Sequence, residues 1–315
     1  MRSSRAVGLP LALVSAFAFG GSGPAAKPLL AAGLSPLHIA WMRIAGTALI
    51  LLPIALRHLP EARRRPLLVL AYGVFPMAGV QACYFAAVSR IPVGVALLIE
   101  YLGPVLMLGW VRFVRRRHVS WYAGLGAVLA VGGMTAVVEI WQGMRFDGVG
   151  IALALGAAVC QACYFLLGDT GGEPVDATAL ISQGAVVGAV LISALARPWT
   201  VPWHVLGDTA ALGPFRWPAY VYVLWIVLVT TVVSYVTGVL AVRLLSPQVA
   251  GVVSYLELVV ATVLAWLLLG ESLTGVQLAG GALVLAGAFV AQMSTPAPDV
   301  VVPAAEADVA RVHQT

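Results

Sequence analysis

Charged side chains are scarce in this sequence: only 10% of its 315 residues are Asp, Glu, Lys or Arg, whereas 61% are hydrophobic. Soluble domains carry about 25% charged residues, so the composition excludes a water-soluble globular protein. A lipid-spanning helix needs about 20 consecutive apolar residues, and the chain contains many such runs. With a mean hydropathy of +0.97, the sequence predicts an all-α polytopic membrane protein.

Several motifs of soluble enzymes are missing. The sequence has no G-x-x-x-x-G-K-[ST] phosphate loop and no H-E-x-x-H zinc motif, so neither ATP hydrolysis nor zinc chemistry is expected. Its three cysteines, Cys83, Cys160 and Cys163, lie in apolar segments, which argues against a disulfide framework. Cys160 and Cys163 have redox-pair spacing, but a helix turn in lipid is a poor setting for thiolates. We expect no cofactor and no metal.

Ten apolar segments have the character of transmembrane helices. The first one could pass for a signal peptide, but a signal peptide normally precedes a soluble mature protein, and the rest of this chain is membrane-like. We expect that helix to break near Gly20–Pro24. The tail from Ser294 to Thr315 has no hydrophobic period and is expected to be disordered. The predicted spans are Val7–Leu30, Leu37–Leu56, Leu67–Val88, Val93–Val111, Trp121–Val138, Gly148–Leu167, Thr178–Leu195, Pro218–Val242, Val249–Leu269 and Val276–Gln292.

The distribution of basic residues predicts the orientation, because cytoplasmic loops collect Lys and Arg. With both termini in the cytoplasm, the outer loops hold only Arg90, Arg145, Arg197 and Arg216. The long outer connection, about Ala196 to Trp217, has aromatic residues suited to a membrane interface. The net charge of +5 comes from short clusters between apolar runs, so no nucleic-acid partner is expected. The inner side holds Arg2, Arg5, Arg57, Arg63, Arg64, Arg65, Arg112, Arg115, Arg116, Arg117, Arg243 and Arg311.

A faint internal repeat relates residue n to residue n+154. It pairs Tyr101-Leu102 with Tyr255-Leu256, and Gly126 and Gly133 with Gly280 and Gly287. Because five helices per half is an odd number, the second half would enter the membrane inverted. The basic cluster Arg112–Arg117 has no counterpart at Trp266–Glu271, as the positive-inside rule requires of inverted copies. The predicted units are residues 1–147, residues 148–293 and a cytoplasmic tail, residues 294–315.

Two carboxylates fall near the middle of predicted spans. Glu100 lies eight residues after Pro92 and Glu257 ten after Pro247, so both reach roughly 12–15 Å into the layer. An acid at that depth costs several kcal/mol when charged unless it is protonated. It could couple export to proton entry or hold a substrate ammonium group. The alternative is a hydrogen bond to a neighbouring helix that only fixes packing.

Two basic residues also fall within spans. Lys27 is expected to extend its amine to the membrane interface. Arg43 lies one to two turns into its helix, where it could form a structural ion pair or bind the carboxylate of a substrate.

The pentapeptide Gln81-Ala-Cys-Tyr-Phe85 recurs as Gln161-Ala-Cys-Tyr-Phe165. Gln81 and Tyr84, like Gln161 and Tyr164, are three residues apart and share one helix face. With Tyr101 and Tyr255 they could line a polar cavity, or they could form interhelical hydrogen bonds. Gly184-Ala-Val-Val-Gly188 fits a close helix contact, usually internal packing rather than a dimer face.

The run Leu245-Ser-Pro-Gln-Val-Ala250, through Tyr255-Leu-Glu257 to Leu267-Leu-Leu-Gly-Glu271, resembles the end of an EamA repeat. Gly280–Gly287 continues the resemblance, and Ala96–Pro104 echoes it in the first half. The resemblance implies the drug/metabolite transporter superfamily, with ten helices in two inverted five-helix repeats. The first-half motif looks most like the amino-acid exporter branch, which includes threonine/homoserine exporters. Leu258 is a departure, because the family often has proline there.

The sequence therefore predicts a secondary transporter, not an enzyme, in the inner membrane of a bacterium. It would export a small polar metabolite by alternating access, and the resemblance favours amino acids or related amines. Helices three, four, six, eight and nine would form the cavity walls. The rivals are a membrane enzyme and a non-transporting scaffold, and uptake cannot be separated from export. Membrane lipid is the expected environment of a monomer or homodimer.

Overall fold

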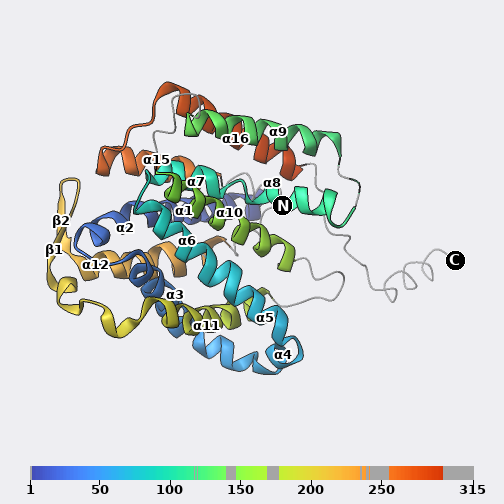
Figure 1. Ribbon diagram of the computed structural model, residues 1–315. Coiled ribbons are helices and arrows are strands. Elements are labelled where there is room, and N and C mark those ends of the chain that lie inside the picture. Colours follow the sequence, from blue (N-terminus) through green and yellow to red (C-terminus); the bar gives the residue numbers. More distant parts are fainter. Residues whose placement is uncertain are drawn as a thin grey trace.

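The computed structural model describes residues 2–116, 118, 120–139, 147–168, 177–234, 236–238, 241 and 255–293 (Figure 1). Within these residues the chain is almost entirely helical, with one small hairpin. The first part contains α1 (Arg2–Gly20), α2 (Ser22–Ala31), α3 (Pro36–Arg57), α4 (Leu59–Arg64), α5 (Pro66–Tyr72), the π-helix η1 (Gly73–Gly79), α6 (Val80–Val88), α7 (Val93–Glu100), α8 (Gly103–Phe113) and α9 (Trp121–Val138). The second contains α10 (Gly148–Gly168), α11 (Ala177–Ala196), the 3-10 helices η3 (Pro198–Thr200) and η4 (Trp203–Gly207), β1 (Thr209–Leu212), β2 (Phe215–Pro218), α12 (Ala219–Leu224), the π-helix η5 (Trp225–Val233), α15 (Leu256–Leu269) and α16 (Gly275–Met293).

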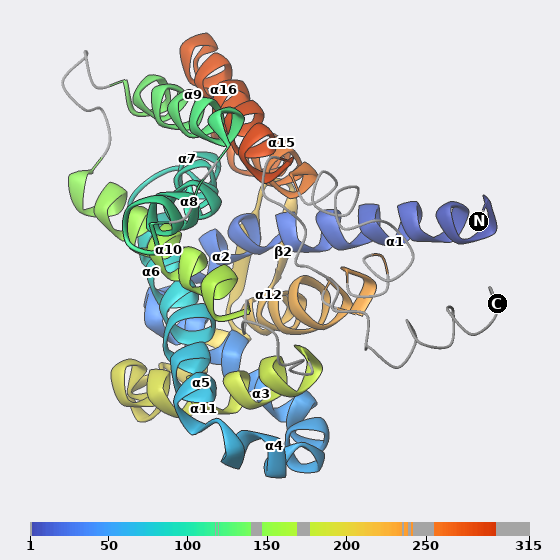
Figure 2. The ribbon, with the colours of Figure 1, turned by 90° about the vertical axis from the view of Figure 1, so that its right-hand side faces the viewer.

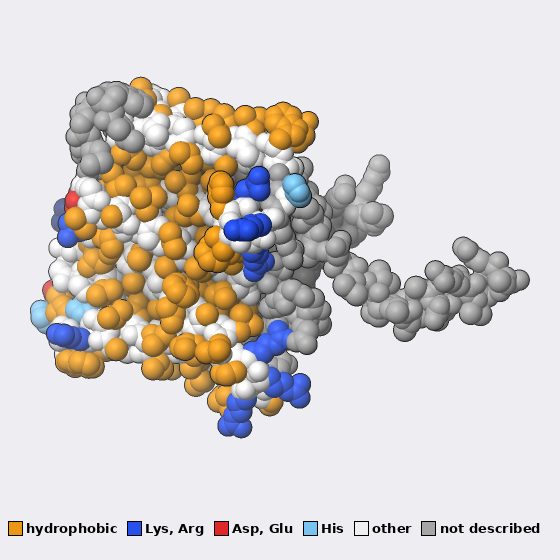
Figure 3. All heavy atoms as spheres, turned by 45° about the vertical axis from the view of Figure 1, so that its right-hand side comes forward, with side chains coloured by type: hydrophobic (Ala, Val, Ile, Leu, Met, Phe, Trp, Pro, Cys, Tyr) orange, Lys and Arg blue, Asp and Glu red, His pale blue; other side chains and the backbone are white. Residues whose placement is uncertain are grey.

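Seven helical stretches are long and apolar enough to cross a membrane. They coincide with predicted spans one to five, seven and eight, while the other three spans appear as shorter apolar helices, Gly148–Tyr164, Leu256–Leu269 and Gly275–Val290. The molecule also exposes large apolar side chains such as Leu67 and Phe113, which are 78% and 80% exposed, and one face carries a broad hydrophobic area (Figure 3). An exposed apolar surface of this extent fits lipid contact. The prediction of a polytopic helical membrane protein is confirmed. The predicted disordered tail and Arg117 lie outside the described residues.

The first span breaks where the sequence predicts, at Gly21 between α1 and α2. The amide of Gly21 still donates to the carbonyl of Phe17 at 3.3 Å, so the interruption is brief. A Cβ on Gly20 would lie 2.8 Å from Cγ1 of Val260 and 2.9 Å from the carbonyl oxygen of Glu257. Glycine therefore lets α1 approach the backbone of α15 closely.

The fourth span has a break that the sequence analysis missed. The chain turns at Tyr101 and Leu102, so α7 ends at Glu100 and α8 starts at Gly103. Pro104 explains the break, because it has no N–H to donate to the carbonyl of Glu100 four residues earlier. The consequence is that Glu100 lies at a helix end inside the bundle.

Two stretches wind as π-helices, and each has a local cause. Pro76 lies within η1 and removes one backbone donor. In η5, the hydroxyls of Thr230 and Thr231 donate to the carbonyl of Ile226 at 2.8 and 2.9 Å. Such side-chain bonds compete with the backbone ladder and widen a helix turn.

Helices α9 and α16 lie side by side in both views of the ribbon (Figures 1 and 2). A Cβ on Gly133 would lie 2.5 Å from the carbonyl oxygen of Gly280. A Cβ on Gly287 would collide with backbone atoms of Gly126 and Ala130. Small residues therefore allow these two helices to touch along their backbones, as in many membrane helix pairs.

The predicted internal contact of Gly184 and Gly188 is confirmed, because both pack against η1 and its flanks. A Cβ on Gly188 would lie 2.8 Å from Cβ of Met77 and 3.1 Å from the carbonyl oxygen of Gly73. A Cβ on Gly184 would lie 2.6 Å from the ring of Tyr72. The two glycines thus bring α11 against the π-helical segment.

The connection after α11 departs from the all-α prediction, because β1 and β2 form an antiparallel hairpin (Figure 1). Gly213, with a φ of +60°, makes the turn and rests on the backbone of Leu268. The hydroxyl of Tyr222 donates to the carbonyl of Ala210 at 3.2 Å. Trp199 and Trp203 are exposed, and their role at a membrane interface stays a prediction.

Candidate functional site

Arg43 is buried inside the helix bundle, with only 6% of its surface exposed. Its Nη1 donates to Oγ of Ser22 on α2 at 2.5 Å, and Nη2 lies 3.4 Å from the carbonyl oxygen of Thr230 in η5. The guanidinium carbon lies 5.8 Å from the centre of the Phe85 ring on α6. These contacts fix the cation among α2, α3, α6 and η5.

A pocket with an empty volume of about 550 Å³, part of it open to the outside, adjoins Arg43. Its walls come from α3, η1, α6, α11 and η5, with one more residue, Val236, beyond η5. Mostly apolar walls with a few polar groups are typical of small-molecule sites. The lining residues are Arg43, Ile44, Thr47, Leu51, Met77, Gln81, Ile181, Ala185, Thr231, Val232 and Val236.

The two glutamates lie in neighbouring parts of the bundle. Tyr101, directly after Glu100, donates its hydroxyl to Oε2 of Glu257 at 3.1 Å. The rings of Tyr101 and Tyr255 lie 5.6 Å apart between their centres. Glu257 is in the first turn of α15, where a carboxylate is favoured by the helix dipole. Four of the predicted site residues therefore meet at the break between α7 and α8.

Glu100 differs from Glu257 in its surroundings. Its surface is 9% exposed, and within the described part of the chain no hydrogen bond or ion pair reaches its carboxylate. Glu100, Glu257 and Arg43 all lie within electrostatic range of one another. Arg43 and the two glutamates thus place one cation close to two acids, and a bare acid at this depth is costly unless protonated or paired with a ligand.

Of the two repeated pentapeptides, only the first lies at the pocket. Gln81 lines it, and its Oε1 is buried without a hydrogen-bond partner among the described residues. Tyr84 is buried one turn further along α6, with its hydroxyl against Gly23. Gln81 is therefore a candidate for contact with a bound solute.

Gln161 and Tyr164 on α10 do not join Arg43 at the pocket. The side chain of Gln161 packs against Gly103 at the start of α8. Tyr164 is 36% exposed and packs on Tyr72, with 5.8 Å between the ring centres. Their predicted role as pocket residues is not supported by this arrangement, although Gln161 lies near the α7–α8 break.

Cys83 and Cys160 occupy helix contacts. Sγ of Cys160 faces Gly79, and Sγ of Cys83 faces Gly156 at 3.3 Å from the position of an added Cβ. Each thiol therefore fills the space left by a glycine on the facing helix. This arrangement packs α6 against α10.

A polar cluster that the sequence analysis did not foresee lies where α2, α7 and α15 end or begin. Nζ of Lys27 lies 2.9 Å from Oε1 of Glu271, and Oε2 of Glu271 accepts from the backbone N–H of Val93 at 2.8 Å. Lys27 is thus held in an ion pair instead of only extending to the membrane interface. The two partners are 244 positions apart, and no local pattern links them.

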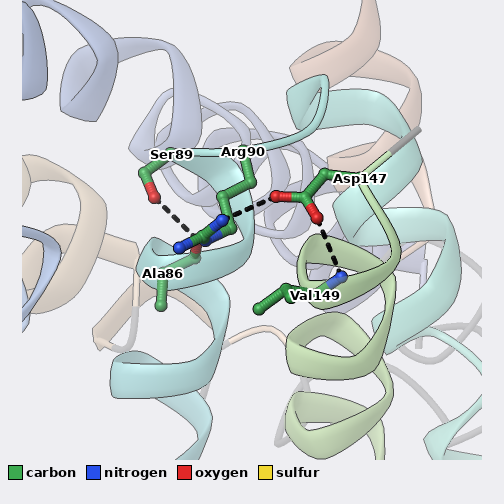
Figure 4. Close-up of polar contacts among 5 residues, drawn as sticks. All are labelled: Ala86, Ser89, Arg90, Asp147 and Val149. Carbon is green, nitrogen blue, oxygen red and sulfur yellow. Dashed lines mark hydrogen bonds and ion pairs between the residues drawn. The ribbon is translucent and has the colours of Figure 1, made fainter.

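A second ion pair at the same end is more exposed (Figure 4). Nη1 of Arg90 donates to Oδ2 of Asp147 at 2.6 Å, while Oδ1 accepts from the backbone N–H of Val149 at 2.9 Å. The hydrogen bond from Arg90 holds the pKa of the Asp147 carboxyl below its usual range. Because both side chains face solvent, this pair contributes little to stability.

Comparison with known sequences identifies the family. Residues 6–138 and 148–293 match the profile described as the EamA-like transporter family. The chain belongs to that family. It is a multi-pass membrane protein of transporter type, as the sequence predicts.

Two relatives of this EamA-like chain have names that describe export. The chain is 29% identical over 227 residues to the threonine/homoserine exporter RhtA of Escherichia coli K12, covering 71% of each protein. It is 28% identical over 270 residues to a Salmonella typhimurium protein named "Probable amino-acid metabolite efflux pump", covering 84% of this chain and 85% of the relative.

A solved crystal structure with 18% sequence identity also superposes on this EamA-like chain, with a TM-score of 0.55. The superposition covers 93% of this chain and 97% of the other. At this identity the likeness concerns the fold alone.

Proposed function

We propose that this protein is a secondary transporter that exports small polar metabolites, with amino acids or related amines as its substrates. The observation that carries the proposal is the buried Arg43, which borders a mostly apolar pocket and has Glu100 and Glu257 within electrostatic range. Ionisable residues inside a membrane bundle are costly, and they usually serve ion or substrate pathways. A non-transporting scaffold or a membrane enzyme does not require a buried cation beside a pocket.

The substrate class follows from the charges at the site. An amino acid carries a carboxylate and an ammonium group, and the pocket offers a guanidinium for the first. Glu257 or Glu100 could hold the second, and the other acid could carry a proton. The names of the relatives, a threonine/homoserine exporter and an amino-acid metabolite efflux pump, agree with this class.

The mechanism we propose is alternating access by two inverted five-helix halves, residues 1–147 and 148–293, with ten transmembrane helices in all. The contacts between α9 and α16 support it. The 154-residue shift makes Gly126 equivalent to Gly280, and Gly133 equivalent to Gly287. In the structure the contacts are crossed: Gly133 contacts Gly280, and Gly126 contacts Gly287. The shift therefore converts one contact into the other, which is expected when the two halves are related by a two-fold axis.

Two further features fit the same relation. Tyr101 and Tyr255, which are equivalent under the shift, contact each other, as residues on the axis should. The π-helix η1, shifted by 154 residues, covers 227–233, within η5. Both π-helices border the pocket through Met77, Thr231 and Val232, and π-helical turns often occur at functional sites. In this mechanism they are the parts of the wall that rearrange.

We place the protein in the bacterial inner membrane with both termini in the cytoplasm. The support is the clustering of Lys and Arg in the segments predicted to be cytoplasmic, since cytoplasmic loops collect such residues; in Figure 3 several Lys and Arg side chains gather on one side of the apolar face. In this proposal the chain works as a monomer or homodimer. Its partners in this proposal are membrane lipid and a small solute.

Counterflow in proteoliposomes tests this function. Liposomes holding the purified protein are loaded with one unlabelled solute, and entry of a trace of the same labelled solute is followed across a panel of amino acids, amines and sugars. Saturable counterflow of at least one amino acid or amine is expected. Counterflow of sugars alone would contradict the substrate class, and no flux for any solute would favour the scaffold.

Arg43→Gln is expected to weaken substrate affinity by about tenfold to a hundredfold, because it removes a charge-assisted hydrogen bond of about 1.5–3 kcal/mol. The half-saturation concentration in the counterflow assay measures this. Arg90→Gln is the matched control, because Arg90 is an exposed arginine away from the pocket, and it should leave the constant unaltered. An unchanged constant in Arg43→Gln would remove the carboxylate-binding role.

A further inference from the structure

The cluster of Lys27, Glu271 and Val93 joins segments that are far apart in the chain. Glu271, in the connection between α15 and α16, contacts Lys27 of α2 through Oε1 and the first residue of α7 through Oε2. Nζ of Lys27 also lies 3.4 Å from the carbonyl oxygen of Ile91. One carboxylate from the second half of the chain therefore ties together two helices of the first half. We call these three residues the clasp.

The geometry of Glu271 follows from the end of α15. Gly270 adopts a φ of +69°, and the amide of Glu271 donates to the carbonyl of Ala265 at 3.2 Å. This is the helix-ending turn that glycine favours, and it directs Glu271 across to α7. The carboxylate then accepts from an N–H at the start of α7, where a negative charge also complements the helix dipole.

The clasp and the pocket lie toward opposite ends of the bundle. Along α3 the pocket is lined from Arg43 to Leu51, about 12 Å in the direction of Arg57. Along α7, Val93 lies at the opposite end, and Glu100 follows about 10 Å deeper. The clasp thus closes the end of the bundle away from the pocket, and it holds the helix that ends in Glu100.

We propose that Glu271 is a positioning residue for transport: it holds α7 and α2 in the state closed at the Lys27 end, and its release accompanies opening of that end. This inference rests on the proposed transport function. The binding of Glu271 to the α7 backbone, together with its ion pair to Lys27, is what makes it a clasp. An ion pair alone would tie only α2 to the second half.

The test measures how fast a cysteine in α7 reacts with a water-soluble reagent, and it does not depend on solute flux. Ala96 lies in α7, close to Val93, and is fully buried. Ala96→Cys is introduced into a background lacking Cys83, Cys160 and Cys163, and its reaction with a water-soluble maleimide is timed in nanodiscs, where both faces are accessible. Glu271→Ala should raise the labelling rate by about tenfold or more, as loss of a charge-assisted hydrogen bond implies. Glu271→Gln, which keeps an acceptor but loses the charge, should have an intermediate effect.

The Arg90–Asp147 pair provides the matched control at the same end (Figure 4). Asp147→Asn breaks an exposed ion pair that does not contact the start of α7, so the labelling rate should stay at its starting value. A rate that rises equally in Asp147→Asn and Glu271→Ala would reflect general loosening and would overturn the proposal. An unchanged rate in Glu271→Ala would overturn it as well.

Exchanging the two charges separates the clasp from a simple ion pair. Lys27→Glu combined with Glu271→Lys restores opposite charges, but an ammonium group cannot accept from the N–H of Val93. The exchanged protein should therefore label as fast as Glu271→Ala. Labelling at the original slow rate would show that the ion pair alone keeps this end closed, which contradicts the positioning of α7.

The accessibility result is independent of the solute. If counterflow fails for every solute while Glu271→Ala still raises labelling, the transport proposal is wrong, and with it the role of Glu271 in transport, but the closure of this end by Glu271 is still shown. If counterflow succeeds while labelling is unchanged, the transport proposal stands and the clasp is wrong.

Discussion

Glu100→Gln is expected to abolish proton-driven transport, reducing flux to the level of protein-free liposomes while the protein still inserts and folds. Glutamine has nearly the shape of the acid but cannot bind or release a proton. Glu100 is 9% exposed, and no hydrogen bond from the described residues holds its carboxylate, so the substitution breaks no such contact. The measurement is solute flux driven by an imposed pH gradient, beside counterflow without a gradient.

The two assays distinguish the roles of the acid. If Glu100 carries the proton, gradient-driven flux is lost and counterflow persists, whereas both fail if it holds the ammonium group of the substrate. Asp208→Asn, at an exposed acid before the hairpin, should change neither. Gradient-driven flux at the original rate in Glu100→Gln would leave Glu100 with a packing role only.

Gly133→Ala is expected to destabilise the protein by about 3 kcal/mol or more, because overpacking a tight contact costs 1–3 kcal/mol and this one involves backbone. A Cβ there would lie 2.5 Å from the carbonyl oxygen of Gly280 and 2.7 Å from the backbone nitrogen of Val284. Neither atom can turn aside as a side chain can, so α9 and α16 would have to separate. Thermal unfolding of the purified protein in detergent measures the loss.

The neighbouring glycine is the control. A Cβ on Gly132 would meet no atom within 4 Å, so Gly132→Ala should keep the melting temperature within a few degrees of the original value. Equal melting temperatures for the two variants would mean that the backbone contact of α9 with α16 contributes little to stability.

The sequence was informative where local composition decides the structure. Apolar runs gave the positions of the membrane helices, and Gly20–Pro24 gave the break between α1 and α2. The glycines of the predicted repeat proved to lie at the contact of α9 with α16. These features depend on helix geometry and small side chains, which a single sequence records.

Long-range contacts were not accessible in the same way. The partners of Arg43, Ser22 on α2 and Thr230 in η5, are brought together only by the packed bundle. The same holds for Lys27 and Glu271. The break after Glu100 could have been foreseen from Pro104, since a proline removes the bond to the fourth residue before it.

The repeated pentapeptide did not predict the surroundings of its two tyrosines. Tyr84 is buried with its hydroxyl against Gly23, while the matching Tyr164 is 36% exposed beside Tyr72. Identical local sequences occur here on helices with different neighbours, and it is the neighbours that decide which face meets a cavity.

The central claim is that two inverted halves surround one pocket with buried charges, and sidedness tests it most directly. His118 and Ser272 are equivalent under the 154-residue shift, and both are exposed. With His118→Cys and Ser272→Cys made separately in the background without native cysteines, a membrane-impermeant maleimide is applied to intact cells and to lysed cells. The account predicts labelling of Ser272→Cys in intact cells and of His118→Cys only after lysis. Labelling of both positions from the same side would contradict it.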